Sequence, residues 1–434
     1  MPASVRAPSE VGLYIHVPFC LRRCPYCDFT IAVTSAPPEL PYVDALLAEL
    51  DARAGELEGL ALRTVYLGGG TPGLLGRAAI ERLARGLRDR QLNPSDELTV
   101  ELNPERVSDE QLDAWLALGM TRASIGAQSL QPHVLSTLGR HHTACDVEHL
   151  TQRLHARGVR HVSLDLILGT PGATLDDLAA DLHGMARLPG VDHLSIYELT
   201  WEWRTAFTVA RDRGALTAWP DDALVDAFQL AADLAAQHGF TRYEVSSYAR
   251  PGGRAAHNSA YWTGRPYVGI GPGAHSLRVS PDGAIIERRR NVPGLRHYLA
   301  HPAAPAMIES PIVEHMAGDR KAPGTAASDT SAPVSSVPVS GAPDRAPRAP
   351  VAERLTPRQH LFERLFTALR CVEGVDLGVL EDDFRVDLSA LDPLLISWQA
   401  RGFGVSGGRR FVPGAHGLLH GDLLAGEVHE ALEG

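Results

Sequence analysis

Three cysteines lie close together near the start of the chain. Cys20, Cys24 and Cys27 form a Cys-x3-Cys-x2-Cys run directly after an apolar stretch. A [4Fe-4S] cluster normally takes four thiolates, so three thiolates at this spacing would leave one iron open to a small molecule. A zinc site completed by His16 or Asp28 is the alternative. We expect no disulfide framework, because five cysteines are too few to staple 434 residues and no secretory signal is expected before them.

Alternating strands and helices are expected to position these cysteines. Six short β-rich runs cover 13–17, 64–67, 98–102, 123–125, 162–168 and 193–197. Amphipathic helical stretches separate them, at about 44–51, 75–90, 108–118, 144–157 and 174–188. Parallel strands need helical crossovers, so this order predicts an α/β fold with a parallel sheet or barrel.

Each predicted strand ends in a motif with polar residues or glycines. The cysteines follow the first strand, and the later strands end in Gly68-Gly69-Gly70-Thr71-Pro72, Glu101-x-Asn103-Pro104, the 124–129 segment with Gln128, Asp165 through Gly169-Thr170-Pro171-Gly172, and Tyr197-Glu198. The carboxyl ends of barrel strands form one face, which holds the active site. Taken singly, the glycines could serve only a turn, the carboxylates could form surface salt bridges, and Gln128 could satisfy a backbone group.

Together with the three-cysteine loop, these motifs resemble the radical S-adenosylmethionine (radical SAM) superfamily. The resemblance implies a partial (β/α)6 barrel, a [4Fe-4S] cluster on Cys20, Cys24 and Cys27, and SAM on the open iron. It places the SAM contacts at Tyr14, Gly69, Gly70, Thr71, Glu101, Gln128, Arg140 and Asp165. The glycines and Thr71 would border the methionine amine, and the charged residues and Gln128 would hold the carboxylate and ribose regions. Carboxylates suit ribose hydroxyls, and an arginine suits a carboxylate.

The second half of the chain contains three further motifs. They are the 242–252 segment, His257-Asn258-Ser259-Ala260-Tyr261-Trp262, and the 269–276 segment. They resemble the group of proteins related to oxygen-independent coproporphyrinogen III oxidase, and within it the haem chaperone branch. Phe29 stands where the oxidase has a further cysteine, which favours the chaperone. The resemblance implies haem binding through His257, Asn258, Tyr261 and Trp262.

Alternatives remain at this stage for the motif and for the function. His257 could be a buried structural histidine beside two core aromatic residues. The protein could also be the oxidase itself, which decarboxylates propionates by radical chemistry. Two positions depart from the family pattern: Ala255 replaces a cysteine found in many relatives, and Glu202-Trp203-Arg204-Thr205 replaces a Glu-x-Gly-Thr element.

Composition predicts the domain organisation. We expect an N-terminal tail over 1–10, the barrel and haem-motif region over 11–301, and a flexible linker over 302–353. The linker is rich in Ala, Pro, Ser and Gly and buries too little apolar surface to fold. From 354 to 434, helices followed by a small hairpin predict a winged-helix-like α+β domain.

Charge and hydropathy limit the partners. The net charge is −11, and from Arg354 onward 8 Arg stand against 12 Asp and Glu, so we expect no nucleic-acid binding. No apolar run is long enough for a transmembrane segment, and we expect a cytoplasmic protein. The resemblance implies haem as a ligand and client haemoproteins as partners, with respiratory enzymes at the membrane among the candidates.

Overall fold

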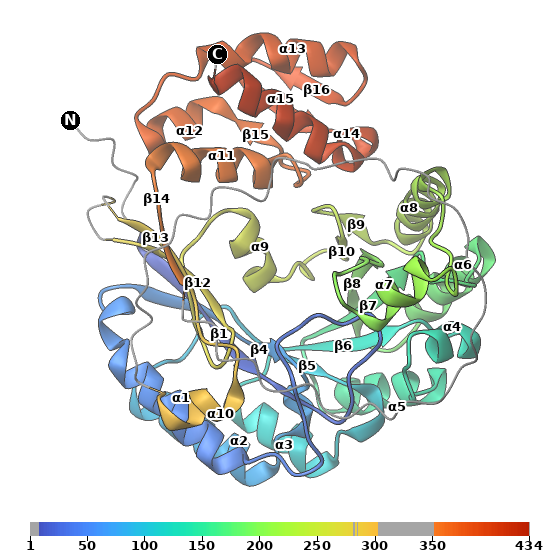
Figure 1. Cartoon of the computed structure of the whole chain (residues 1–434), viewed down its shortest axis with the longest axis vertical. Helices are drawn as coiled ribbons and strands as arrows, with labels where there is room; N and C mark the ends of the chain where they lie inside the picture. Colours follow the sequence, from blue (N-terminus) through green and yellow to red (C-terminus); the bar gives the residue numbers. More distant parts are fainter. Residues whose placement is uncertain (1–7, 281–282, 284, 303–350, 434) are drawn as a thin grey trace, which may run out of the picture.

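The six expected strands form the centre of a large twisted sheet. The computed structural model describes residues 8–280, 283, 285–302 and 351–433. The central strands are β1 (Glu10–Val17), β4 (Ala61–Gly69), β5 (Glu97–Leu102), β6 (Arg122–Gln128), β7 (His161–Leu168) and β8 (Val191–Glu198). They are parallel and adjacent in that order. The structure confirms the α/β class and the partial (β/α)6 barrel (Figure 1).

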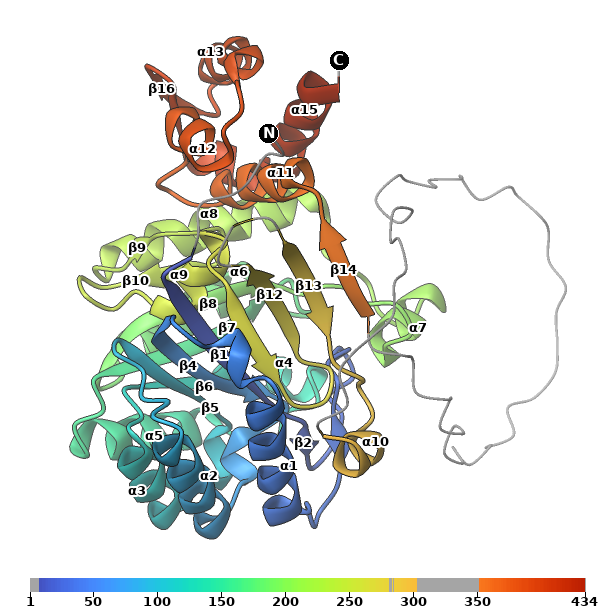
Figure 2. The same ribbon diagram turned by 90° about the vertical axis from the view of Figure 1, so that its left-hand side faces the viewer.

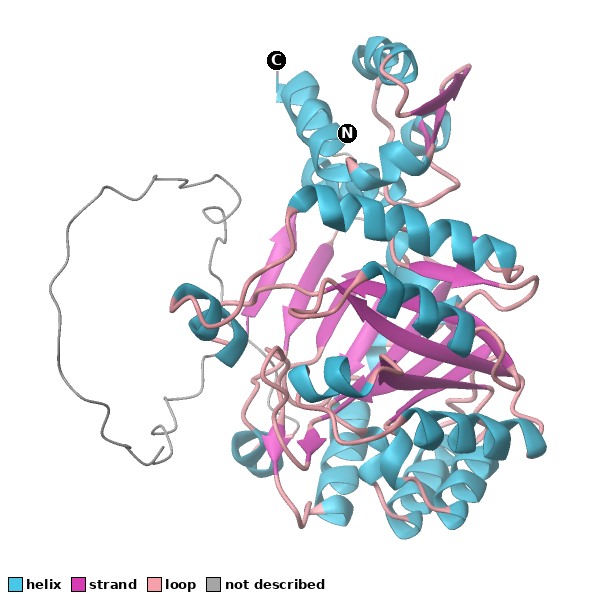
Figure 3. Ribbon diagram, turned by 90° about the vertical axis from the view of Figure 1, so that its right-hand side faces the viewer, coloured by secondary structure: helices cyan, strands magenta, loops and turns pink. Residues whose placement is uncertain are grey.

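Helices cover the outer face of the barrel (Figure 3). They are α1 (Glu39–Ala52), α2 (Arg77–Asp89), α3 (Asp109–Leu118), α5 (Ala144–Ala156), α6 (Leu175–Met185) and α8 (Asp221–Gln237). Two more helices, α4 (Pro132–Thr137) and α7 (Ala206–Asp212), pack in a separate apolar cluster with Tyr26 of the cysteine loop. Capping boxes at Ser108, Thr143 and Thr174 start α3, α5 and α6, because each hydroxyl accepts a free backbone N–H. Gly119 ends α3 at φ 108°, as its position in the sequence predicts.

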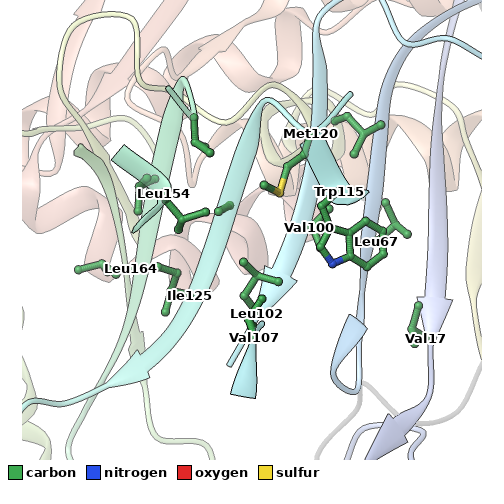
Figure 4. Packing of buried hydrophobic residues seen from close by; sticks show 14 of the residues in the cluster. Val17, Leu67, Val100, Leu102, Val107, Trp115, Met120, Ile125, Leu154 and Leu164 are labelled. Atoms are coloured by element: carbon green, nitrogen blue, oxygen red, sulfur yellow. The ribbon is translucent and has the colours of Figure 1, made fainter. Parts of the chain in front are cut away.

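The core lies between the sheet and these helices. Trp115 of α3 and Leu154 of α5 pack against strand residues such as Val100, Ile125 and Leu164 (Figure 4). All five side chains are fully buried. This packing holds the strand ends, and hence the motifs that follow them, in fixed positions.

Shorter strands extend the sheet at both edges. β11 (Tyr267–Ile270) runs parallel to β1, and β12 (His275–Val279), β13 (Ile286–Arg290) and β14 (Val351–Leu355) continue antiparallel (Figure 2). At the other edge lie β10 (Ser247–Ala249) and β9 (Thr241–Arg242). The remaining elements here are β2 (Phe19–Cys20), β3 (Ala32–Val33), α9 (Ala256–Trp262) and α10 (Leu295–Ala300). The edge strands β9 to β14 and the two short strands β2 and β3 were not predicted from the sequence.

The C-terminal part has its own core. Its elements are α11 (Pro357–Ala368), β15 (Val375–Asp376), α12 (Leu377–Phe384), α13 (Asp392–Ala400), β16 (Gly404–Gly407), β17 (Arg410–Pro413), α14 (Ala415–Leu419) and α15 (Gly421–Glu433). The order helix, strand, two helices and hairpin is winged-helix-like, as expected. Leu365, Trp398 and Phe411 are buried at its centre. It contacts the barrel through the Arg288–Glu363 ion pair (3.0 Å) and a hydrogen bond from Val372 N–H to the Tyr243 carbonyl (3.1 Å).

The predicted domain boundaries stay predictions. Residues 303–350 of the expected linker and 1–7 of the expected tail lie outside the described residues. The described chain resumes in β14, which pairs with β13, so residues 351–353 belong to the sheet. None of the helices in the described ranges has a stretch apolar and long enough to cross a lipid bilayer.

Candidate functional site

A cavity of about 900 Å³ lies inside the barrel and reaches the carboxyl ends of the strands. This volume is at the upper end of the range of roughly 300–1,000 Å³ for small-molecule sites. Its lining includes nearly all the site residues expected from the sequence: Cys20, Cys24, Cys27, Tyr14, Gly69, Gly70, Thr71, Glu101, Gln128, Arg140, Asp165, His257, Asn258 and Tyr261. Trp262 is not among the described residues that line it.

The three cysteines have free, half-buried thiols. The Cys27 N–H donates to the Cys24 carbonyl (3.1 Å), which bends the loop between them. Cys20 Sγ lies 3.6 Å from Thr71 Oγ1, and Arg140 Nη1 lies 3.9 Å from Cys24 Sγ. Burial raises the pKa of Cys27 to about 11 and also raises the pKa of Cys20. A bound metal reverses that preference, because coordination deprotonates a thiol.

The zinc alternative needs His16 or Asp28 as a further ligand. Within the described ranges, no group of three or more His, Cys, Asp or Glu side chains is arranged to hold a metal ion. His16 is not a free ligand either, since its Nε2 pairs with the Thr30 carbonyl (2.7 Å) and its Nδ1 with the Tyr14 hydroxyl (3.0 Å). A [4Fe-4S] cluster held by the three cysteines would take each thiolate on a different iron.

The glycine run packs against the cysteine loop. Gly69 has φ 107°, and a Cβ there would lie 2.4 Å from the His16 ring, so only glycine fits. The Gly69 N–H donates to Glu101 Oε2 (2.9 Å), and the Tyr66 hydroxyl donates to Glu101 Oε1 (2.7 Å). Burial raises the pKa of Glu101. These contacts fix the carboxylate at the end of β5, facing the cavity.

Arg140 lies between the cysteine loop and β6. Its Nη2 donates to Asn103 Oδ1 (2.9 Å) and to the Gly126 carbonyl (2.7 Å). Its buried Nε has no hydrogen-bond partner in the described part of the chain. A buried unpaired donor is costly, and a ligand carboxylate would satisfy it.

Gln128 and Asp165 complete the wall on the side of β6 and β7. Gln128 has φ 64°, a strained conformation for a residue other than glycine that concentrates at functional sites. Asp165 accepts from Ser124 Oγ at 3.5 Å. Burial, and then the charge of Glu101, raise the pKa of Asp165 to about 7. Ribose hydroxyls are suitable partners for such a carboxyl group.

The His257 element lies at the opposite end of the cavity. His257 is buried, its Nδ1 pairs with Thr64 Oγ1 (2.7 Å), and its Nε2 pairs with the Tyr261 hydroxyl (2.8 Å). Thr64 is near the start of β4, five residues before Gly69, so His257 lies roughly 16 Å along the strand from the cysteine end. Burial lowers the pKa of His257 to about 4, so the ring is neutral. Its role as a haem ligand stays a prediction, and coordination requires breaking one of its hydrogen bonds.

Three functional or positioning residues were not assigned from the sequence. Asn103 joins Thr71 Oγ1 (3.1 Å) to Arg140. Its place in the strand-end motif Glu101-x-Asn103-Pro104 was the available signal. Glu97 accepts the N–H groups of Ala256 and His257 (both 3.1 Å), and Arg122 binds Glu97 (2.8 Å). Both lie at strand starts, where the sequence offered no signal.

The sequence and fold of the chain are similar to those of known radical SAM proteins. The family model of the radical SAM superfamily matches residues 14–183, and that of the HemN C-terminal domain matches residues 355–420. "Heme chaperone HemW" of Mycobacterium tuberculosis is 43% identical over 283 residues, which is 63% of this chain and 72% of the relative. The chain belongs to the HemW family.

Further members of the HemW family show the same likeness. The Escherichia coli heme chaperone HemW is 37% identical over 64% of this chain and 72% of its own length. The Bacillus subtilis protein is 32% identical over 66% and 74%. The solved structure of E. coli coproporphyrinogen III oxidase (HemN) has a TM-score of 0.71 at 22% identity, over 98% of this chain and 90% of that one. That likeness shows the shared fold. Membership of the radical SAM superfamily implies a [4Fe-4S] cluster and SAM.

Proposed function

We propose that the protein is a cytoplasmic haem chaperone that binds a [4Fe-4S] cluster, SAM and haem and delivers haem to client haemoproteins. Respiratory enzymes at the membrane are candidate clients. The observation that supports this most is the single cavity that has three free thiols at one end and the His257 element at the other. The names of the HemW relatives support the haem part of the proposal.

Different residues at the cysteine end of the cavity bind the cluster and SAM. Cys20, Cys24 and Cys27 supply the thiolates, and Arg140, already fixed by Gly126 and Asn103, offers its guanidinium to a carboxylate. When bound, the cluster supplies one-electron reduction and an open iron for the methionine end of SAM. Gly69 lets the chain pass close to His16, where an added Cβ would clash.

The residues on β5 to β7 are suited to the polar part of SAM. Glu101 is held by two hydrogen bonds, so it presents a fixed acceptor to the cavity. Asp165, with its pKa near 7, accepts or donates at neutral pH. Gln128 is held on the wall by its strained backbone. These side chains therefore bind and orient SAM.

The oxidase is the second candidate, because the complete SAM-binding set is what a radical enzyme requires. Phe29 argues against the oxidase. This residue lines the cavity at the position where the oxidase has a cysteine, and it is 60% exposed. A phenyl ring can neither donate a proton nor bind a metal as a thiol does. Phe29 instead offers an apolar surface at the cavity wall.

One pair of assays on the cluster-loaded protein tests the proposal. Titration with ferric haem should give a saturable Soret band, and anaerobic incubation with coproporphyrinogen III, SAM and a reductant should leave the substrate unchanged. Formation of protoporphyrinogen would instead establish the oxidase. Absence of any haem binding would refute the chaperone.

A further inference from the structure

The histidines that line the cavity differ in whether they can bind a metal. His16 and His257 have both ring nitrogens in hydrogen bonds. His193 has Nε2 bonded to the Tyr243 hydroxyl (2.8 Å), and its Nδ1 is buried. In the described part of the chain, no hydrogen bond engages the ring of His275, whose side chain is exposed and lines the cavity. An iron ligand needs an accessible nitrogen lone pair, so His275 is better prepared than His257.

His275 lies beside an arginine that is available for an anion. It is the first residue of β12 and stands directly opposite Arg290 of β13, so both side chains are on the same face. Of the neighbouring arginines, Arg288 pairs with Glu363 (3.0 Å) and Arg289 with Glu56 (3.4 Å). No carboxylate of the described residues pairs with Arg290, which also lines the cavity.

The His275–Arg290 pair is next to the end of the cysteine loop. Gly273, two residues before His275, packs so closely on Thr30 that a Cβ would lie 2.6 Å from Thr30 Oγ1. Phe29 precedes Thr30 and lines the same cavity with an exposed ring. An imidazole and a guanidinium therefore stand opposite each other on this wall, and Phe29 lines the same cavity from the residue before Thr30.

These three groups match the chemistry of haem. Haem has an iron that binds imidazole, two propionate carboxylates and a flat apolar face. We propose that His275 is an axial ligand of the haem iron, with Arg290 on a propionate and Phe29 against the porphyrin face. This inference rests on the proposed function and assigns its ligand site. The His257 element at the far end of the cavity is the competing ligand assignment, and it stays a prediction.

The electrostatics agree with a ligand role. Partial burial, together with Arg290 and Arg288, lowers the pKa of His275. The ring is therefore neutral at physiological pH and keeps a lone pair for iron. Arg290, which pairs with no carboxylate of the described residues, gives this wall a positive charge that suits a dianionic porphyrin.

The test is a titration of the full chain with ferric protoporphyrin IX and, separately, with metal-free protoporphyrin IX. His275→Ala should shift the Soret band and weaken ferric haem binding roughly tenfold or more, and added imidazole should restore the spectrum. Binding of the metal-free porphyrin should not change, since it has no iron. Arg290→Gln should weaken both porphyrins roughly tenfold, because it removes a charge-assisted contact.

His141→Ala is the matched control, since His141 is also an exposed histidine of the cavity wall. It should leave both titrations as in the wild type. If the wild type binds haem and His275→Ala keeps its spectrum and affinity, the ligand assignment is wrong and the proposed function stands. If the wild type binds no haem, both the assignment and the proposed function fail.

Discussion

The ion pair between Glu97 and Arg122 is predicted to hold α9 at the far end of the cavity. Both side chains are almost fully buried, with 5% and 2% exposed. Arg122 donates to Glu97 Oε2 (2.8 Å), Ser163 Oγ (3.0 Å) and the carbonyls of Gly253 (2.9 Å) and Arg254 (3.1 Å). Arg122→Met keeps an unbranched apolar chain but leaves a buried carboxylate without its cation. Removing one partner of a buried pair costs about 3–5 kcal/mol, and we expect a loss of this size.

Urea denaturation followed by circular dichroism measures that loss in the barrel. Arg63→Met is the matched control, because its pairs with Asp96 (2.6 Å) and Glu10 (3.6 Å) are partly exposed and each should contribute at most about 1 kcal/mol. The double variant Glu97→Gln, Arg122→Met should lose less stability than the two single variants together, since it removes both charges. A change below about 1 kcal/mol for Arg122→Met, or strict additivity, would refute the reasoning.

The same pair predicts a dependence on pH. Burial would raise the pKa of Glu97, but the charge and hydrogen bond of Arg122 and the N–H groups of His257 and Ala256 outweigh it, and the pKa is lowered. A depressed carboxyl pKa contributes stability that is fully present above the unfolded value of about 4.3. That contribution is lost as the pH falls through the folded value. The loss of stability caused by Arg122→Met should therefore shrink as the pH falls below about 4.3, because the wild type loses the contribution of the pair while protonation removes the unpaired charge of Glu97 in the variant. Urea denaturation at neutral and at acidic pH measures this, and a difference that stays constant with pH would contradict it.

Three further predictions concern the cavity and the domains. Arg140→Ala should weaken SAM binding roughly tenfold or more in calorimetry on the cluster-loaded protein, because it removes a charge-assisted hydrogen bond; unchanged affinity would exclude Arg140 from the pocket. Because burial raises the pKa of Asp165 to about 7, the free energy of unfolding should fall as the pH rises from about 4 to 7, and Asp165→Asn should make that fall smaller in denaturation curves; an unchanged slope would contradict the pKa assignment. The composition of 302–353 predicts protease cleavage between about 315 and 350, and the two fragments should co-elute in gel filtration because contacts such as Arg288–Glu363 join them; fragments that separate would show that these contacts are too weak.

The barrel was predicted from the sequence, and the motif residues expected at its strand ends lie together in one cavity. Strands with strong apolar character, such as β7, have a local signal, and the motifs at their ends face one cavity as expected for parallel strands. A capping box of Thr356 and Gln359, which are three residues apart in the sequence, starts α11. Short-range patterns therefore identified the elements that depend on short-range chemistry.

The edge strands and the side-chain contacts in the cavity were not predicted, because they depend on contacts between residues far apart in the chain. β9 to β14 are short and contain glycines and arginines, so their edge pairing has no clear period in the sequence. One of the two hydrogen bonds of the His257 ring involves Thr64, 193 residues away, and no sequence pattern indicates that contact. The pairing of His275 with Arg290 likewise follows from the register of β12 and β13.

Metal and sulfide analysis after anaerobic reconstitution tests the central claim most directly. We predict about four irons and about four acid-labile sulfides per chain, with the visible absorption of an iron–sulfur cluster. Cys24→Ser should abolish the cluster, and Cys145→Ser, a change at an exposed cysteine outside the loop, should leave it intact. One tightly bound zinc with no sulfide in the wild-type protein would contradict the account.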